Sequence, residues 1–273
     1  MKASIRIILI CTIASASILA LYWNTLKLLT MTSSSAHTKR PEYPSGIPDK
    51  FSPDGKVQPF SGNTIICPLS PASELYTSLL DLYEQLDQSP IAQSYNLLPP
   101  SSWHMTVFDA VVDSRREPGV WPNDLAANAS MDECTAHFQG KLKRFDIGAE
   151  GVPYQISVTS ADPFAIRGGL ALSLQPSPQD ETALRGLRDR IAATLGVRKS
   201  DHEIYRFHLS IAYLLRYLDG AHEAEVRRIF TEHFEKLLPV SIELGRLEFC
   251  TFEDMTAYEP VLVLSETEQK ELL

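Results

Sequence analysis

Two short motifs in this sequence pair a histidine with a hydroxyl-bearing residue two positions later. His104 is followed by Thr106 and His208 by Ser210, and apolar residues stand beside each member. Side chains alternate across a β-strand, so each histidine shares a face with its hydroxyl if both motifs lie in strands. The apolar residues between them then point into a core. Each strand therefore presents one titratable ring and one hydroxyl on the same side.

Such a set suits acid–base chemistry on a phosphoester. One imidazole can take a proton from the attacking oxygen while the other gives a proton to the leaving oxygen. Histidine fits both roles because its unperturbed pKa of about 6.5 leaves both forms accessible near neutral pH. Proton transfer by a positioned group contributes ~10²–10⁴ in rate. The hydroxyls of Thr106 and Ser210 can donate hydrogen bonds to phosphoryl oxygens, so the scheme calls for no metal and no cofactor.

Motifs for other chemistries do not occur. The segment that begins at His222 departs from H-E-x-x-H because position 226 is valine, so a metalloprotease helix is not expected. The sequence has no G-x-S-x-G elbow and no G-x-x-x-x-G-K phosphate loop. Its four cysteines form no C-x-x-C pair, which argues against a zinc site and favours buried free thiols.

The composition is that of an acidic globular protein. The chain has 273 residues, of which 44% are hydrophobic and 22% charged, with a formal net charge of −9. This length allows a sizeable core. An acidic surface argues against non-specific DNA binding, which needs Lys and Arg to neutralise phosphates, so we expect no DNA partner. A small anion in a local basic pocket is compatible with it, and we expect a monomer.

The first thirty residues form a separate segment. An uncharged run from Ile7 to Leu26 follows Lys2 and Arg6, and about 20 apolar residues are enough to span a bilayer. We expect residues 1–30 to be an N-terminal membrane anchor, with a cleaved signal peptide and entry into the secretory pathway as the alternative. A polar linker over residues 31–56 and a catalytic domain over residues 57–273 follow. The sequon at Asn128 would be glycosylated only in a secretory lumen.

Helical and extended patterns alternate along the domain. Each half contains a strand, a helix and a strand that bears a histidine motif, which indicates an α+β fold with antiparallel sheets. A helix between the N-cap residue Ser177 and Gly196 is the clearest element. The other predicted helices cover 71–86, 123–145 and 221–238, and the strands cover 63–69, 103–112, 154–159, 169–174, 207–215, 240–252 and 259–264.

The flanks of the two motifs carry a family resemblance. The strings are His104-Met-Thr-Val-Phe-Asp and Phe207-His-Leu-Ser-Ile-Ala-Tyr213, with Arg116-Glu-Pro and Trp121-Pro between them. They resemble the paired signatures of the two-histidine (2H) phosphoesterase superfamily, which includes RNA 2′,3′-cyclic phosphodiesterases, historically called 2′-5′ RNA ligases. The resemblance covers roughly residues 63–264. It implies a bilobal fold of two antiparallel sheets backed by helices around a central cleft, with both motif histidines catalytic.

Two further residues are candidates for substrate binding. The family often has a tyrosine five residues after the second histidine, a position that Tyr213 occupies here. Strict alternation would turn Tyr213 away from Ser210, so this role requires a β-bulge or a strand end. Arg206 shares the strand parity of His208 and can pair with a phosphate, the alternative being an exposed charge or a salt bridge. Arg115, Arg116 and Trp121 are weaker candidates, since such residues more often stay solvated or pack locally.

The predicted function is metal-independent hydrolysis of a cyclic phosphodiester, such as a nucleoside or RNA-terminal 2′,3′-cyclic phosphate. The residues assign the acid and base roles only to the histidines as a pair. One alternative is an exonuclease of the same fold that trims RNA 3′ ends, which would need an open basic groove. The other is a membrane-tethered module that binds a phosphate-bearing ligand without turnover, which would leave a histidine or a hydroxyl off the shared face.

Overall fold

A computed structural model of the protein describes residues 40–148 and 152–264. The predicted α+β class is confirmed, because four α-helices and ten strands alternate in this part of the chain and its strands pair antiparallel. The elements are β1 (Gly62–Pro68), α2 (Glu74–Asp87), β2 (Tyr95–Leu97), β3 (His104–Val112), α3 (Met131–Leu142), β4 (Tyr154–Val158), β5 (Gly169–Ser173), β6 (Gln175–Pro176), α4 (Pro178–Leu195), β7 (His208–Leu214), α5 (Gly220–Phe234), β8 (Val240–Leu244), β9 (Leu247–Phe252) and β10 (Glu259–Leu264).

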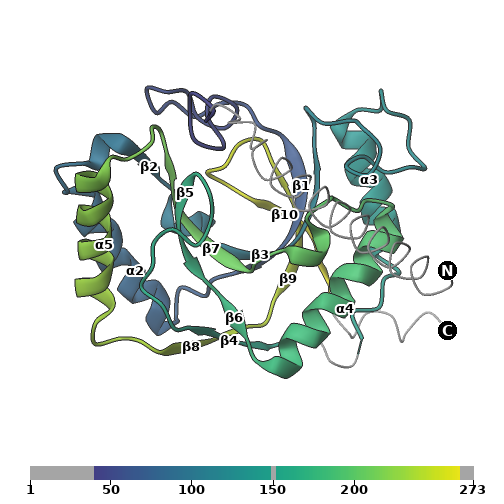
Figure 1. Ribbon diagram of the computed structural model, residues 1–273. Helices are drawn as coiled ribbons and strands as arrows, with labels where there is room; N and C mark the ends of the chain where they lie inside the picture. The colour runs from purple at the N-terminus through teal and green to yellow at the C-terminus, as the bar shows by residue number, and fades with distance from the viewer. Residues whose placement is uncertain (1–39, 149–151, 265–273) are drawn as a thin grey trace, which may run out of the picture. The chain divides into compact units, whose positions relative to one another are not determined.

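The strands form two antiparallel sheets (Figure 1). The larger has seven strands in the order β10-β9-β1-β3-β7-β2, with β5 paired to β7, and the smaller has the order β6-β4-β8. The two strands that begin with His104 and His208 are neighbours in the larger sheet. Segments about a hundred residues apart are thus brought side by side.

Helices pack at both ends of the larger sheet and contribute apolar side chains to the core. Figure 1 shows α2 beside α5 at one end and α3 beside α4 at the other, and these pairs are in contact. The apolar residues of β3 and β7 share one core cluster with the helical stripes that recur every three or four residues. In α2 and α4 these stripes are Leu75, Leu79, Leu82, Leu86, Leu184, Leu187, Ile191 and Leu195.

The helix ends follow their capping residues. Ser177 caps the N-terminus of α4 and Gly196 ends it in the left-handed region with φ of 71°, as the sequence predicts. The predicted helix over 123–145 is wrong at its start, because α3 begins only at Met131. Ser130 and Glu133 form a capping box there, which fixes the first turn. The residues before Ser130 form a loop.

One predicted strand is wrong as a single element. The segment predicted over 240–252 divides at Gly245 into β8 and β9, which belong to different sheets. The apolar alternation shifts by one position across Gly245-Arg246, from Val240, Ile242 and Leu244 to Leu247 and Phe249, and this shift marks the change of sheet. The short strands β2 and β6 were not predicted either, because two or three residues are too few to show a period.

The segment before β1 packs against the end of the larger sheet. The predicted linker, residues 31–56, is described from residue 40 onward, and the residues from Tyr43 belong to the same compact unit as the sheets. Phe51 is completely buried in a second apolar cluster. The predicted leader, residues 1–30, lies outside the described residues, so its membrane or secretory role stays a prediction. In residues 40–148 and 152–264, no helix is long and apolar enough to cross a membrane.

This packing makes the segment part of the folded domain. We expect Phe51→Ala to lower the free energy of unfolding by about 3–5 kcal/mol, since it removes a fully buried aromatic ring and leaves a cavity. Urea unfolding followed by circular dichroism measures this. Val57→Ala is the control, because Val57 is 42% exposed and should change stability by less than about 0.5 kcal/mol. Equal stability of the two variants would contradict the packing role of Phe51.

Candidate active site

The pairing of β3 with β7 defines the site. Met105 lies opposite Leu209, and both are buried in the core. His104 and His208 precede them on the two strands, point to the other face and are partly exposed. Because the strands are antiparallel, the two histidines are diagonal neighbours, a relation that spans about 7–8 Å. Side chains that lie diagonally on one face of a sheet can approach a common ligand from two sides.

The two hydroxyls complete this face. The same register sets Thr106 beside His208 and Ser210 beside His104, and both hydroxyl residues are partly exposed. Each hydroxyl therefore borders the histidine of the opposite strand as well as sharing a face with its own. The Nε2 atom of His104 lies 3.1 Å from Oγ1 of Thr106. The face thus presents two imidazoles and two hydroxyls together.

The two histidines are held in the same way. Nδ1 of His104 lies 2.6 Å from the carbonyl oxygen of Ser102, and Nδ1 of His208 lies 2.8 Å from that of Arg206. A carbonyl oxygen only accepts, so Nδ1 carries the hydrogen in both rings and Nε2 of each neutral ring keeps a lone pair. Thr106 consequently donates its hydroxyl hydrogen to Nε2 of His104. Both reactive nitrogens face the sheet surface rather than the backbone.

Burial keeps His104 neutral. The pKa of this imidazole is lowered to about 4, mainly by burial and to a smaller extent by the nearby His208, whereas the carbonyl of Ser102 and the carboxylate of Asp109 act in the opposite direction. A neutral imidazole at pH 7 is ready to accept a proton.

The lowered pKa of His104 makes stability depend on pH. The folded value lies below the unfolded value of about 6.5, so the unfolded chain binds one more proton between these two values. Stability is therefore lost as the pH falls from about 6.5 to about 4. We expect the difference in free energy of unfolding between wild type and His104→Gln to decrease over this range in urea titrations. A difference that is constant with pH would contradict the depressed pKa.

A β-bulge turns Tyr213 onto the histidine face. Two consecutive residues of β5 pair with Ser210 and Ala212, so Ile211 is an extra residue on β7. Ile211 and Ala212 are both buried, and Tyr213 is partly exposed. The extra residue shifts the alternation by one position, so Tyr213 shares the face of His208. This is the bulge that a role for Tyr213 in the site requires.

The first motif has the same irregularity. Two consecutive residues of β1 pair with Thr106 and Phe108, so Val107 is extra on β3 and Asp109 becomes partly exposed. Asp109 stands five positions after His104, as Tyr213 stands five after the second histidine. Sequence reasoning missed Asp109 as a site residue. The equal spacing of Asp109 and Tyr213 from their histidines is the sequence signal by which Asp109 could have been found.

Two tyrosines from outside the motifs flank the histidines. The ring of Tyr258 meets that of His104 edge-on at 4.4 Å, and the ring of Tyr205 lies 5.9 Å from that of His208. Against the larger effect of burial, an interaction with the Thr106 side chain lowers the pKa of the Tyr205 phenol. Burial raises the pKa of both phenols, so both stay protonated at neutral pH. Neither tyrosine was identified from the sequence, because both precede strands in irregular segments.

The phenol of Tyr205 orients the Thr106 hydroxyl. Its interaction with the Thr106 side chain restricts the rotation of that side chain and so keeps the hydroxyl beside Nε2 of His104. We expect Tyr205→Phe to lower kcat about 3–15-fold, the equivalent of one hydrogen bond of about 0.5–1.5 kcal/mol. The phenylalanine keeps the ring, so the melting temperature serves as the control for folding. An unchanged kcat would exclude this orienting role.

The candidate residue Arg206 is exposed, and its backbone carbonyl oxygen accepts a hydrogen bond from Nδ1 of His208.

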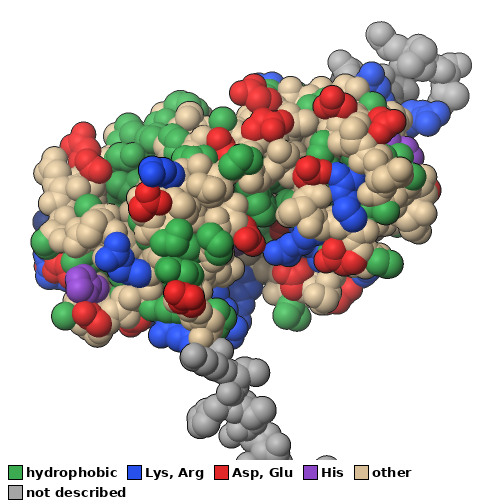
Figure 2. Space-filling model, turned by 90° about the horizontal axis from the view of Figure 1, so that it is seen from above, with side chains coloured by type: hydrophobic (Ala, Val, Ile, Leu, Met, Phe, Trp, Pro, Cys, Tyr) green, Lys and Arg blue, Asp and Glu red, His purple; other side chains and the backbone are tan. Residues whose placement is uncertain are grey.

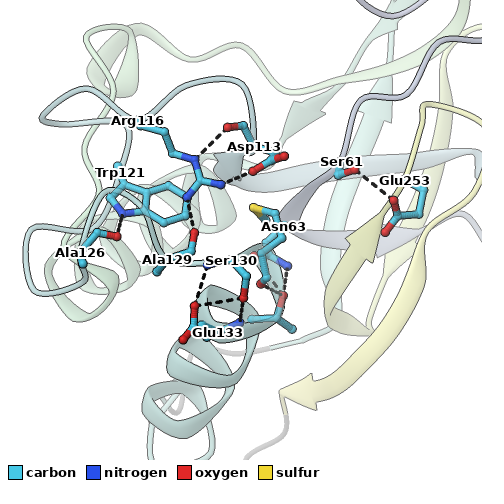
Figure 3. Close-up of polar contacts among 12 residues, drawn as sticks. Ser61, Asn63, Asp113, Arg116, Trp121, Ala126, Ala129, Ser130, Glu133 and Glu253 are labelled. Carbon is cyan, nitrogen blue, oxygen red and sulfur yellow. Dashed lines mark hydrogen bonds and ion pairs between the residues drawn. The ribbon is translucent and has the colours of Figure 1, made fainter.

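Arg116 and Trp121 instead lie in the loop before α3 and stabilise it (Figure 3). Trp121 is 3% exposed and donates from Nε1 to the carbonyl of Ala126, with the Arg116 guanidinium 3.7 Å from its ring centroid. Arg116 also donates to the carbonyl of Ala129 at 2.8 Å. Arg116 and Trp121 therefore form these contacts with neighbouring residues of the same loop. Arg115 is exposed, and so is Asn128 of the sequon.

A cluster of possible metal ligands lies elsewhere in the described structure. Ligand atoms of Asp189, His202 and Glu203 all fall within 4.8 Å of one another. The guanidinium of Arg198 bonds both carboxylates, so a cation already occupies the cluster. His202, expected to be exposed, is 5% exposed and bonds Asp189 at 3.0 Å. These contacts assign the cluster a structural role.

The cysteines Cys67, Cys134 and Cys250 are free and buried, as the sequence favours.

Comparisons with known proteins bear on the family and the fold. Residues 50–167 match the family model 2H-phosphodiest, described as a domain of unknown function, DUF1868. A conserved protein of unknown function from Agrobacterium tumefaciens has the same fold. It is 25% identical, with a TM-score of 0.71 over 82% of this chain and 94% of that one.

Two other solved structures, of a phosphoesterase and of LigT from Escherichia coli, are less similar. Each is 10% identical over 76% of this chain and 97% of the other. Their TM-scores are 0.44 and 0.42. Among curated proteins no relative matches this chain.

Proposed function

Through residues 50–167 this chain belongs to the two-histidine (2H) phosphoesterase superfamily, and on that premise we propose that it hydrolyses a nucleoside or RNA-terminal 2′,3′-cyclic phosphate. Action on a phosphodiester bond follows from the superfamily. The observation that supports this reaction is the pairing of β3 with β7, which gathers His104, Thr106, His208 and Ser210 on one face. Two proton carriers and two hydroxyl donors are what the reaction needs.

The proposed reaction assigns one role to each histidine. Neutral His104 takes a proton from water, whose oxygen attacks the phosphorus. The bond from phosphorus to one ribose oxygen breaks, and His208 in its protonated form gives that oxygen a proton. Thr106 and Ser210 donate to the non-bridging oxygens, where charge increases in the transition state. His104 gains one proton and His208 loses one, so the total number of protons on the two rings is unchanged by the reaction.

The charge distribution favours a small substrate over long RNA. On the face in Figure 2, acidic and basic side chains are interspersed among apolar and neutral ones. The chain carries a net charge of −9. Binding a long RNA strand depends on many Lys and Arg contacts to phosphates. These observations support a mononucleotide or a short RNA end and weigh against an exonuclease that follows a long strand.

The test is turnover of the four nucleoside 2′,3′-cyclic phosphates by the full chain in the presence of EDTA. We expect hydrolysis that survives chelation, with a 2′- or 3′-monophosphate as product. Failure of folded protein to hydrolyse any of the four would overturn the cyclic-phosphate proposal. Shortening of an oligoribonucleotide from its 3′ end would then favour the exonuclease, and nucleotide binding without turnover would favour the non-catalytic binding module.

A further inference from the structure

Lys50 is a cation at one end of the histidine face that no carboxylate neutralises. Its Nζ donates to Oη of Tyr213 at 2.8 Å and lies 4.8 Å and 5.1 Å from the ring centroids of Tyr213 and Phe60. In the part of the chain that the structure describes, no carboxylate forms an ion pair with this nitrogen, whereas Lys56 pairs with Asp54. An ammonium group has three hydrogens to donate, so two remain for another acceptor.

Lys50 is connected to the catalytic face through side chains in contact. The Tyr213 hydroxyl lies 3.6 Å from the sulfur of Met255, and the Tyr258 hydroxyl lies 4.0 Å from the same sulfur. The ring of Tyr258 in turn meets that of His104 at 4.4 Å. The ammonium group is therefore separated from the catalytic imidazole by two phenols and a thioether. It borders the site without touching its reacting centre.

The separation along β7 points to the same conclusion. Tyr213 lies five residues after His208, and one of these is the bulged Ile211. Four strand steps of about 3.3 Å set the two backbones roughly 13 Å apart. The Lys50 ammonium, bonded to Tyr213, is thus offset along the face from a phosphoryl group bound beside His208. Its two remaining hydrogens can bond an acceptor on another part of the substrate.

The backbone around Lys50 is held in place. Gly46 has φ of +95°, and a Cβ atom there would lie 3.0 Å from the ring of Tyr213, so only glycine allows this close approach. The buried ring of Phe51 packs against Tyr213 with centroids 5.3 Å apart. These contacts fix the ring of Tyr213, and a hydrogen bond of 2.8 Å from the Lys50 N–H to the Gly46 carbonyl holds the backbone of Lys50 beside it. Such preorganisation reduces the entropy lost on binding.

We propose that Lys50 and Tyr213 form a subsite for a second phosphate of the substrate, one nucleoside away from the cyclic phosphate. This inference rests on the proposed function. An ammonium group over two aromatic rings, with a phenol beside it, offers a charge-assisted hydrogen bond to a phosphate oxygen. The second phosphate is either a 5′-phosphate on a mononucleotide or the diester that precedes an RNA-terminal nucleotide. The protein thereby distinguishes phosphorylated from unphosphorylated nucleosides at that end.

The test compares substrates with and without the second phosphate. Adenosine 2′,3′-cyclic phosphate, its 5′-phosphorylated form and a dinucleotide with a terminal cyclic phosphate are assayed with wild type, Lys50→Met and Lys56→Met. We expect either added phosphate to raise kcat/KM of wild type about tenfold or more, as a hydrogen bond to a charged group does. The ratio should fall to about one in Lys50→Met and persist in Lys56→Met. The form with the larger gain identifies the source of the phosphate.

Other outcomes overturn the subsite. A wild-type preference that persists in Lys50→Met would do so, and so would an equal loss on all three substrates, which would instead assign Lys50 to the cyclic phosphate. If wild type turns over none of them, the proposed function fails by itself. Calorimetric titration with adenosine 5′-monophosphate then decides the subsite. Binding lost in Lys50→Met supports it, and equal or absent binding in both proteins overturns it.

Discussion

Alanine at His104 or at His208 should lower kcat/KM for a nucleoside 2′,3′-cyclic phosphate by about 10²–10⁴-fold. Each substitution removes one proton carrier from a reaction that needs both, and positioned proton transfer has that magnitude. The effect should fall mainly on kcat, because the imidazoles act in the transition state. Steady-state kinetics with chromatographic separation of the monophosphate product measures both parameters.

The double variant tests whether the histidines act as a unit. Removing both should cost little more than removing one, since neither proton transfer is effective without the other. His137→Ala is a matched control, because this histidine is also partly exposed but bonds Asp124 in the loop before α3. Wild-type activity in either single variant, with the melting temperature unchanged, would exclude the two-histidine mechanism.

Removal of the hydroxyl in Thr106→Val or Ser210→Ala should lower kcat by about 10²–10³-fold. Each hydroxyl donates to an oxygen on which charge increases in the transition state, and loss of one such donor has this cost. KM should change less than kcat, because the interaction strengthens only as the reaction proceeds. Thr106→Val has the larger expected effect of the two, since Thr106 also contacts His104 and Tyr205.

Conservative variants distinguish the effect of the Thr106 hydroxyl on activity from the effect of the side chain's shape. Thr106→Ser keeps the oxygen and should retain activity within about tenfold of wild type. Ser157→Ala is a control for loss of a strand hydroxyl, because Ser157 lies in the smaller sheet, where its hydroxyl contacts that of Ser241. If Thr106→Ser and Thr106→Val were equally slow, packing rather than hydrogen bonding would explain the loss.

The sequence by itself determined the local structure of the site. Alternation within the two motif strands is set by φ and ψ of single residues, so the sharing of a face by His104 and Thr106, and by His208 and Ser210, follows without a partner strand. The ends of α4 were equally local, because Ser177 and Gly196 satisfy the helix termini within one turn. The fold class followed from the order of such elements.

Tertiary structure decided which of these faces meet and what surrounds them. The pairing of Met105 with Leu209 joins segments that no local pattern connects, since strand partners are chosen by packing of the whole core. The bulges that turn Asp109 and Tyr213 onto the face appear only against neighbouring strands. The division of 240–252 between two sheets is decided in the same way.

The remaining site residues come from irregular segments. Tyr205 and Tyr258 reach the histidines from outside the strands, and Lys50 reaches Tyr213 from a segment that its composition predicts to be a linker. An irregular segment lacks the side-chain repeat of a strand or a helix, so its sequence says little about which residues its side chains will contact. The sequence encodes which side of a strand a residue takes. Only long-range packing, which sums contacts from the whole chain, determines its neighbours.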